Sequence, residues 1–257
     1  MSERISIEPL QGMPQIVSGD DIGEIIVNRS QETGFGLEEH DILCVASKAV
    51  SSAEDNVVRL DSITPSDVAR GIHERIPRKD VRAVQAIIDA TGEPSGSRLE
   101  VKDNYVGGWL PNGLFLTSAG VDKLGSEKLI FLPEDPDASA RMIGHKILEL
   151  TGINVAIIIT DSEGRPDKCG STQVAIGVHG MAPLRTSEVI LDNGAIKKTE
   201  ETVCDMLAAS AALLMGQRGV NKPVVRIRGF DYEYDSNTRI TDALVSKNAL
   251  NTEKKIL

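Results

Sequence analysis

Side chains that could hold a metal ion and a phosphate group gather in residues 159–181, ITDSEGRPDKCGSTQVAIGVHGM. An apolar run ends at Asp161, and Ser162, Arg165 and Lys168 follow it closely. Carboxylate and hydroxyl oxygens are the ligands that hard cations such as Mg²⁺ or Mn²⁺ prefer. The two basic side chains could hold phosphate or carboxylate oxygens. The alternative is structural, with Asp161 closing an Asx turn and the basic side chains solvated.

A second carboxylate, Asp122, also follows an apolar run, after the small residues Ser118, Ala119 and Gly120. Functional groups often lie at the carboxyl ends of strands in open sheets. Two aspartates on neighbouring strand ends could therefore share a metal ion. Spacing alone leaves open whether Asp122 and Asp161 meet, or whether each only completes a turn.

A glycine-containing segment, LLMGQRGVNKP at 213–223, follows a predicted helix. Gly216 and Gly219 could let backbone N–H groups approach a phosphate, but a helix C-cap explains Gly216 equally well. The pattern GxxxxGK[ST] does not occur, which excludes an ordinary P-loop. GxSxG and HExxH do not occur either. The histidines show no metal-ligand spacing and are predicted to be structural: His40, His73, His145 and His179.

The elements that must position these residues mix helices and strands. Continuous apolar runs predict buried strands at 41–47 and 154–160. Capping residues predict helices after Asp20 or Asp21, after Thr64 with Pro65 at the first helical position, and from Asp137 to Gly152. We also expect strands at 4–7, 114–122, 173–180 and 223–229, helices at 80–90, 199–215 and 238–245, and a loop or weak hairpin at 92–113. This order favours an α+β fold over a doubly wound sheet.

The composition excludes several classes of protein. The chain has 257 residues, of which 40% are hydrophobic and 26% charged, as in globular proteins. Four Phe, three Tyr and one Trp leave few rings for stacking bases, and a net charge of -10 repels a phosphate backbone, so we expect no nucleic acid partner. Cys44, Cys169 and Cys204 lack CxxC spacing and fit reduced cytoplasmic thiols. No signal peptide or membrane-spanning run is evident, so we expect a cytoplasmic protein without a membrane partner.

Several motifs occur in an order that is typical of one family. TDSEGRP is followed by VAIGVHGM, and EPLQGMPQIVSGDDI lies near the start. DILCVASKAVSSAE, SAGVD, LPEDPDASA, ALLMGQ and PVVRIRG complete the pattern. Over about residues 4–230 the chain resembles the coenzyme F-420:L-glutamate ligase family. TDSxGRP with AIG is the most specific part, and the other segments gain weight from their order.

The resemblance implies a single domain over residues 1–257, built of mixed sheets with flanking helices in two intertwined lobes. It implies a fold that is neither P-loop nor ATP-grasp, and a homodimer. The implied metal ligands are Asp122, Asp161, Ser162 and Gln217. We take the two aspartates as catalytic, and from charge and position we add Lys48 and Arg165 as phosphate or carboxylate partners. The nucleotide-binding residues are expected to be Met13, Pro14, Gln15, Ile16, Ser47, Lys48, Ser52, Gly125, Met215, Gly216, Gln217, Arg218, Gly219, Val220, Asn221 and Lys222.

Two positions and one segment depart from the family pattern. Ser52 stands where the family commonly has a Lys, and Gly125 stands where it often has an Asn. Each replacement loses a polar contact to the nucleotide, which weakens binding by about 1.5–3 kcal/mol. The segment DKCG at 167–170 replaces a pair that resembles WR.

The resemblance implies a two-step amide synthesis with GTP as co-substrate, Mg²⁺ or Mn²⁺, and K⁺ as a further ion. GTP would phosphorylate the terminal carboxylate on the phospholactyl arm of the deazaflavin coenzyme F-420-0. The amine of L-glutamate would then displace phosphate from the acyl phosphate. Two alternatives remain: a family relative that ligates an amino acid to a different carboxylate, and a nucleotide-binding module without ligase activity.

Overall fold

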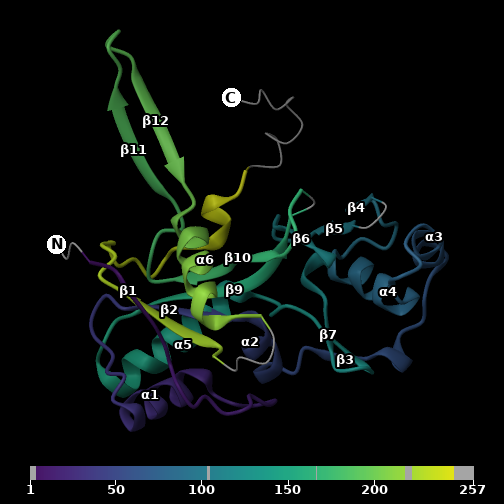
Figure 1. Ribbon diagram of the computed structural model, residues 1–257, viewed down its shortest axis with the longest axis horizontal. Coiled ribbons are helices and arrows are strands. Elements are labelled where there is room, and N and C mark those ends of the chain that lie inside the picture. Colours follow the sequence, from purple (N-terminus) through teal and green to yellow (C-terminus); the bar gives the residue numbers. More distant parts are fainter. Residues whose placement is uncertain (1–3, 103–104, 166, 218–221, 246–257) are drawn as a thin grey trace.

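A mixed five-stranded sheet lies at the centre of the protein, in the strand order β1-β13-β2-β9-β10 (Figure 1). This computed structural model describes residues 4–102, 105–165, 167–217 and 222–245. β2 and β9 run parallel, and the other neighbours in the sheet run antiparallel. The bounds are Ser6–Pro9 for β1, Ile42–Ala46 for β2, Ala156–Gly164 for β9, Ser171–His179 for β10 and Val224–Arg228 for β13.

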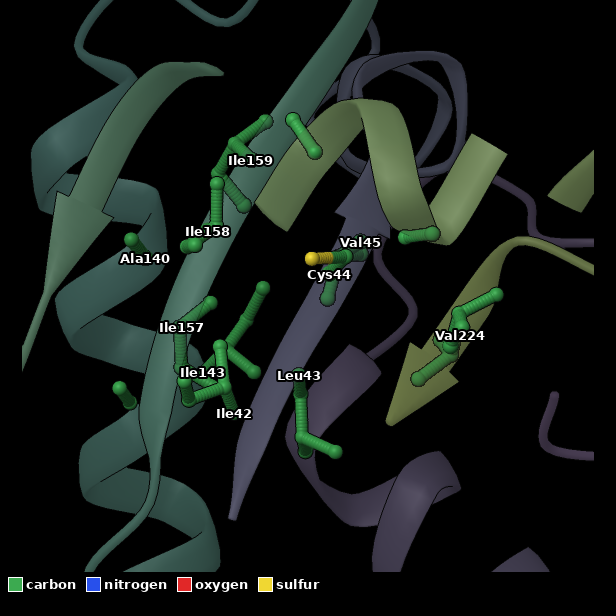
Figure 2. Packing of buried hydrophobic residues seen from close by; sticks show 14 of the residues in the cluster. Ile42, Leu43, Cys44, Val45, Ala140, Ile143, Ile157, Ile158, Ile159 and Val224 are labelled. Atoms are coloured by element: carbon green, nitrogen blue, oxygen red, sulfur yellow. The ribbon is translucent and has the colours of Figure 1, made fainter. Parts of the chain in front are cut away.

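The two parallel strands are continuous apolar runs because helices cover both faces of the sheet. Figure 2 shows residues 42–45 of β2 beside residues 157–159 of β9, and all of these side chains are fully buried. Thr160 faces the helix α6 (Val203–Met215), where its hydroxyl lies 3.7 Å from Met215 Sδ. Ile157 faces the opposite side, against Gly144 of the helix α5 (Pro136–Thr151). The helix α1 (Ile22–Thr33) packs on α5.

The helix boundaries confirm some of the predicted caps and correct others. Asp21 caps α1 by accepting a hydrogen bond from Glu24 N at 3.0 Å, and α5 ends at Gly152, as expected. The N-cap of α5 is Asp135, two residues before the predicted cap Asp137. Asp137 is buried and instead accepts hydrogen bonds from Val178 N and Ile240 N.

A second group of elements lies between β2 and β9 in the sequence and has its own apolar clusters. It contains two three-stranded antiparallel sheets, β3-β8-β7 and β4-β5-β6, with two helices. Ser66, rather than Thr64, caps the first helix. The bounds are Val57–Arg59 for β3, Asp67–Arg75 for α3, Val81–Ala90 for α4, Leu99–Lys102 for β4, Tyr105–Trp109 for β5, Phe115–Thr117 for β6, Asp122–Leu124 for β7 and Lys128–Ile130 for β8. The α+β class is therefore confirmed.

A two-stranded hairpin of β11 (Arg185–Ile190) and β12 (Ile196–Glu201) extends away from the rest of the protein (Figure 1). The prediction of a helix from residue 199 is wrong at its start, because 199–201 belong to β12 and α6 begins at Val203. The predicted last helix is a short 3₁₀ turn, Ile240–Ala243. Within the described parts of the chain, every helix is too short or too polar to cross a membrane.

Candidate active site

Asp161 lies inside β9, at the point where that strand extends beyond its parallel neighbour β2. β9 continues to Gly164, so the expectation that Asp161 ends a strand is wrong. Because β2 stops at Ala46, the helix α2 (Ser47–Ala53) begins beside Asp161. Ser47 Oγ donates a hydrogen bond of 2.6 Å to Asp161 Oδ1. The junction between β2 and α2 thus places a hydroxyl directly on the predicted carboxylate.

The Asp161 carboxylate is only 6% exposed. Its pKa is raised to about 6, mainly by burial and also by the nearby charge of Asp122, although the hydrogen bond from Ser47 and the charge of Lys48 oppose the shift. Asp122 and Asp161 therefore lie within electrostatic reach of one another, as the two-aspartate hypothesis requires. A buried carboxylate held near a second one is better satisfied by a bound cation than by water.

Asp122 is paired with a lysine from α2. Lys48 Nζ lies 2.7 Å from Asp122 Oδ2, and each side chain is close to 40% exposed. Lys48 follows Ser47 in the sequence, so consecutive residues of one helix contact the two aspartates. Neither contact is visible in the spacing of the sequence, because α2 and the two aspartates belong to distant segments.

The turn before Asp122 is a strained left-handed turn. Ser118 and Ala119 have φ values of 55° and 49°, and Gly120 follows at 73°. A non-glycine residue in this region costs about 1–2 kcal/mol. Glycine is favoured at position 120 because its φ is positive, and an added Cβ would lie 2.3 Å from Leu132 Cδ1, so the leucine side chain would have to move. Such strain persists only where surrounding contacts enforce it, and it is common at functional sites.

A small cavity of about 150 Å³ opens beside Asp161. Ser162 Oγ donates to Gln217 Oε1 at 3.1 Å, which joins two of the predicted metal ligands. Further back, Gln173 Nε2 lies 3.3 Å from Met215 Sδ. The predicted residues that line this cavity are Ser47, Lys48, Asp161, Ser162, Met215, Gly216, Gln217 and Lys222.

A larger groove of about 550 Å³ adjoins the small cavity, and Lys48 lines both. Its walls include three predicted nucleotide residues from the opening loop, Pro14, Gln15 and Ile16, and also Ser52. Arg59 and Lys128 line it from β3 and β8, and the sequence motifs did not indicate them. A groove with cations on two sides, next to a carboxylate pair, is suited to a polyphosphate.

Some predicted residues lie elsewhere. Met13 is buried in the central core. Arg165 is exposed, and its guanidinium pairs with Asp167 at 3.0 Å. Gly125 sits in the β7–β8 turn, one residue after Leu124, which lines the groove. Arg218, Gly219, Val220 and Asn221 lie outside the described residues.

The donor set fits a hard divalent cation. Two carboxylates, a hydroxyl and an amide oxygen are oxygen ligands of the kind that Mg²⁺ and Mn²⁺ take. Among the residues that the structure describes, no group of three His, Cys, Asp or Glu side chains could hold a metal. An ion at this site would therefore depend on Ser162 and Gln217 in addition to the two aspartates.

Comparison with known proteins identifies a family of ligases. The chain belongs to the F420-0:Gamma-glutamyl ligase family, whose model matches residues 12–229. It is 36% identical to the coenzyme F420:L-glutamate ligase of Methanothermobacter thermautotrophicus, over 89% of this chain and 90% of the relative. It is 35% identical to the protein of the same name from Methanosarcina mazei, over 96% of this chain and 93% of the relative. The family expected from the motifs is thus confirmed.

Proposed function

We propose that this protein is a GTP-dependent ligase that forms an amide between L-glutamate and the terminal carboxylate of the phospholactyl deazaflavin F-420-0. The observation that carries the proposal is the junction of β2 and α2, where Ser47 contacts Asp161 and Lys48 contacts Asp122. This junction lies between a cavity suited to a metal and a groove suited to a nucleotide. The names of the relatives support the choice of substrates.

The proposed reaction has two steps. A carboxylate oxygen of the deazaflavin arm attacks the γ-phosphorus of GTP, and the bond to GDP breaks. The amine of L-glutamate then attacks the acyl carbon, phosphate leaves with the bonding electrons, and the amine loses a proton. Both steps depend mainly on positioning the reactants and neutralising phosphate charge.

Residues of this chain would position the reactants and neutralise the charge of the phosphates. Lys48 lines both cavities and would leave Asp122 for a phosphate oxygen, while Arg165 would leave Asp167 to hold a phosphate or carboxylate group. Asp122, Asp161, Ser162 and Gln217 would hold Mg²⁺ or Mn²⁺. When bound, the metal would neutralise charge on the phosphates. K⁺ remains part of the proposal as an additional ion.

A second candidate is a relative that joins an amino acid to a different carboxylate. Ser52 favours it, because this small side chain lines the groove where the family commonly has a lysine. A nucleotide-binding module without ligase activity is the third candidate. The three candidates predict different results for the mass of the product and for the release of phosphate.

We also propose that the protein acts as a cytoplasmic homodimer. An isolated two-stranded hairpin is at best marginally stable in water. The β11–β12 hairpin nevertheless exposes Val189, Ile190 and Ile196, with Ile190 74% exposed. Packing against a second copy of the chain would cover these side chains. Cys44, Cys169 and Cys204 are all free thiols, which is compatible with the cytoplasm.

The test is to incubate the purified protein with GTP, Mg²⁺ or Mn²⁺, L-glutamate and F-420-0, and to follow product mass and phosphate release. A mass gain of one or more glutamyl units that needs GTP and metal is the expected result. Phosphate release with only another carboxylate would favour the second candidate. GTP binding without phosphate release for any substrate would favour the third.

A further inference from the structure

The two aspartates of the proposed metal site come from segments that share no strand pairing. Asp161 lies on β9, whereas Asp122 follows the left-handed turn at the end of β6. Asp122 begins β7, which pairs with β8, whereas β9 pairs with β2 and β10, so no backbone ladder joins the two aspartates. The distance between the carboxylates must therefore depend on side-chain contacts.

Ser47 and Lys48 contact the two aspartates from α2, and Glu163 makes a further contact between the two segments themselves. It lies two residues beyond Asp161, and alternate residues of a strand share a face. Its Oε2 accepts a hydrogen bond of 2.9 Å from Thr117 N, and its Oε1 accepts one of 2.7 Å from Thr117 Oγ1. Thr117 is the last residue of β6, immediately before the strained turn. One side chain thus ties the strand of Asp161 to the base of the turn that carries Asp122.

A second contact holds the same turn from the other side. Lys79 Nζ donates a hydrogen bond of 2.9 Å to Ser118 Oγ. The backbone carbonyl of Lys79 lies 2.7 Å from His73 Nδ1, which fixes the segment between α3 and α4. Glu163 holds Thr117 and Lys79 holds Ser118, so both contacts support the start of the turn with two strained non-glycine residues.

The geometry points to Glu163 as a positioning residue, which sets the separation of Asp122 and Asp161 and so the affinity of this site for a divalent cation. Both oxygens of Glu163 accept hydrogen bonds from Thr117, so we take this side chain to act through the turn that carries Asp122. This inference rests on the metal site of the proposed function. Residues that orient metal ligands typically change metal affinity about 10- to 100-fold when they are replaced.

The test is to titrate Mn²⁺ alone into the substrate-free protein by calorimetry. Glu163→Gln keeps the size of the side chain but turns an acceptor into a donor that faces Thr117. We expect it to bind Mn²⁺ about tenfold more weakly or worse. Thr117→Val keeps the backbone hydrogen bond and should give a smaller loss. Glu74→Gln, at an exposed position of α3, is the matched control and should bind as the wild type does.

Kinetics provide an independent readout. Raising the Mn²⁺ concentration should restore the kcat of Glu163→Gln toward the wild-type value, because the variant would lack metal occupancy rather than a reacting group. A loss of kcat that persists at saturating Mn²⁺, with unchanged affinity, would mean that Glu163 takes part in the chemistry and would overturn the inference. So would a lowered melting temperature with wild-type Mn²⁺ affinity. If Glu163→Gln does not fold, Thr117→Val decides the question by the same titration.

The Mn²⁺ titration of the wild type distinguishes a failure of the proposed metal site from a failure of the positioning role of Glu163. If the wild type does not bind Mn²⁺, the metal site of the proposed function fails, and the inference fails with it. If the wild type binds and the variants bind equally well, only the role of Glu163 is refuted.

Discussion

At the scale of single residues, the site concentrates charge where water is scarce. Asp161 is buried, and its pKa of about 6 lies above the ordinary value of 3.8. The folded protein therefore binds more protons than the unfolded chain between about pH 4 and 6, so this group makes the protein less stable as the pH rises through that range. A metal ion would offset this cost, and the stability of the protein should depend on it.

Replacing Asp161 with Asn should separate stability from activity. The variant keeps an oxygen that can accept from Ser47 Oγ but removes the buried charge. We expect its free energy of unfolding without metal to rise by about 1–3 kcal/mol at pH 7.5. The gain should vanish near pH 4, and ligase turnover should be lost. Urea denaturation at pH 7.5 and near pH 4 measures the change in the free energy of unfolding. If Asp161→Asn destabilises the protein equally at the two pH values, the prediction is contradicted.

Protons and metal should compete for the same carboxylate. Because the pKa of Asp161 is about 6, a divalent cation must displace a proton below that pH. We expect the apparent affinity for Mn²⁺ to fall about tenfold for each pH unit below about 6 and to level off above 7. Mn²⁺ titrations from pH 5 to 7.5 measure this. An affinity that does not change across the range would exclude Asp161 as a ligand.

At the scale of elements, close approach between β10 and α5 depends on a glycine. The pairing of β10 with β9 shifts register between Ala175 and Gly177. An added Cβ at Gly177 would lie 2.5 Å from the backbone carbon of Pro136, the first residue of α5. No flexible side chain could move aside to accept it. The register shift in β10 therefore places Gly177 where the first residue of α5 packs closely against the strand.

The variant Gly177→Ala should lower the free energy of unfolding by about 1–3 kcal/mol. Gly71→Ala is the matched control, since Gly71 is in α3 and nothing lies within 4 Å of an added Cβ. The control should be neutral or stabilising by about 0.5–1 kcal/mol. Thermal melting of both variants tests the pair. If Gly177→Ala and Gly71→Ala melt at the same temperature, α5 can move away from the sheet without lowering the stability of the protein.

Elements with strong local signals could be predicted from the sequence, and those that depend on distant contacts could not. The apolar runs of β2 and β9, and the cap at Asp21, depend on neighbours in the chain. The β11–β12 hairpin was missed because both of its faces are exposed, so it lacks the alternation that marks a half-buried strand. Asp137 resembles a helix cap locally, but its partners are Val178 and Ile240, far along the chain.

The residues of the candidate site also include some that the local sequence predicts and others that depend on distant contacts. Asp161, Ser162 and Asp122 could be found because polar residues directly follow apolar runs. The resemblance indicated Ser47 and Lys48 only as nucleotide-binding residues, and charge and position added Lys48 as a phosphate or carboxylate partner. Their contacts with the two aspartates were not predicted. Glu163 lies within TDSEGRP, but at the position that the pattern TDSxGRP leaves open, and no motif indicates Lys79, Arg59 or Lys128. The roles of these four residues depend on which segments the fold brings together.

At the scale of the whole molecule, the exposed hairpin determines the expected assembly. Ile190 and Ile196 are paired directly across the strands and are 74% and 67% exposed. Replacing both with Lys should shift the protein from dimer to monomer, because two charges cannot be buried in an apolar contact. Sedimentation velocity measures the mass of each form. A variant that remains dimeric would place the interface elsewhere, and a monomeric wild type would refute the dimer.

The strand order of the central sheet also has a consequence for synthesis on the ribosome. β13 lies between β1 and β2, yet it begins only at Val224. At about 5–20 residues per second, the ribosome needs roughly 10–40 s to pass from the end of β2 to β13. During that time β1 has no partner, and one edge of β2 stays unpaired and prone to aggregation. Pairing across so large a sequence separation is also slow. The N-terminal residues of the nascent chain are therefore the ones that a chaperone would have to protect longest.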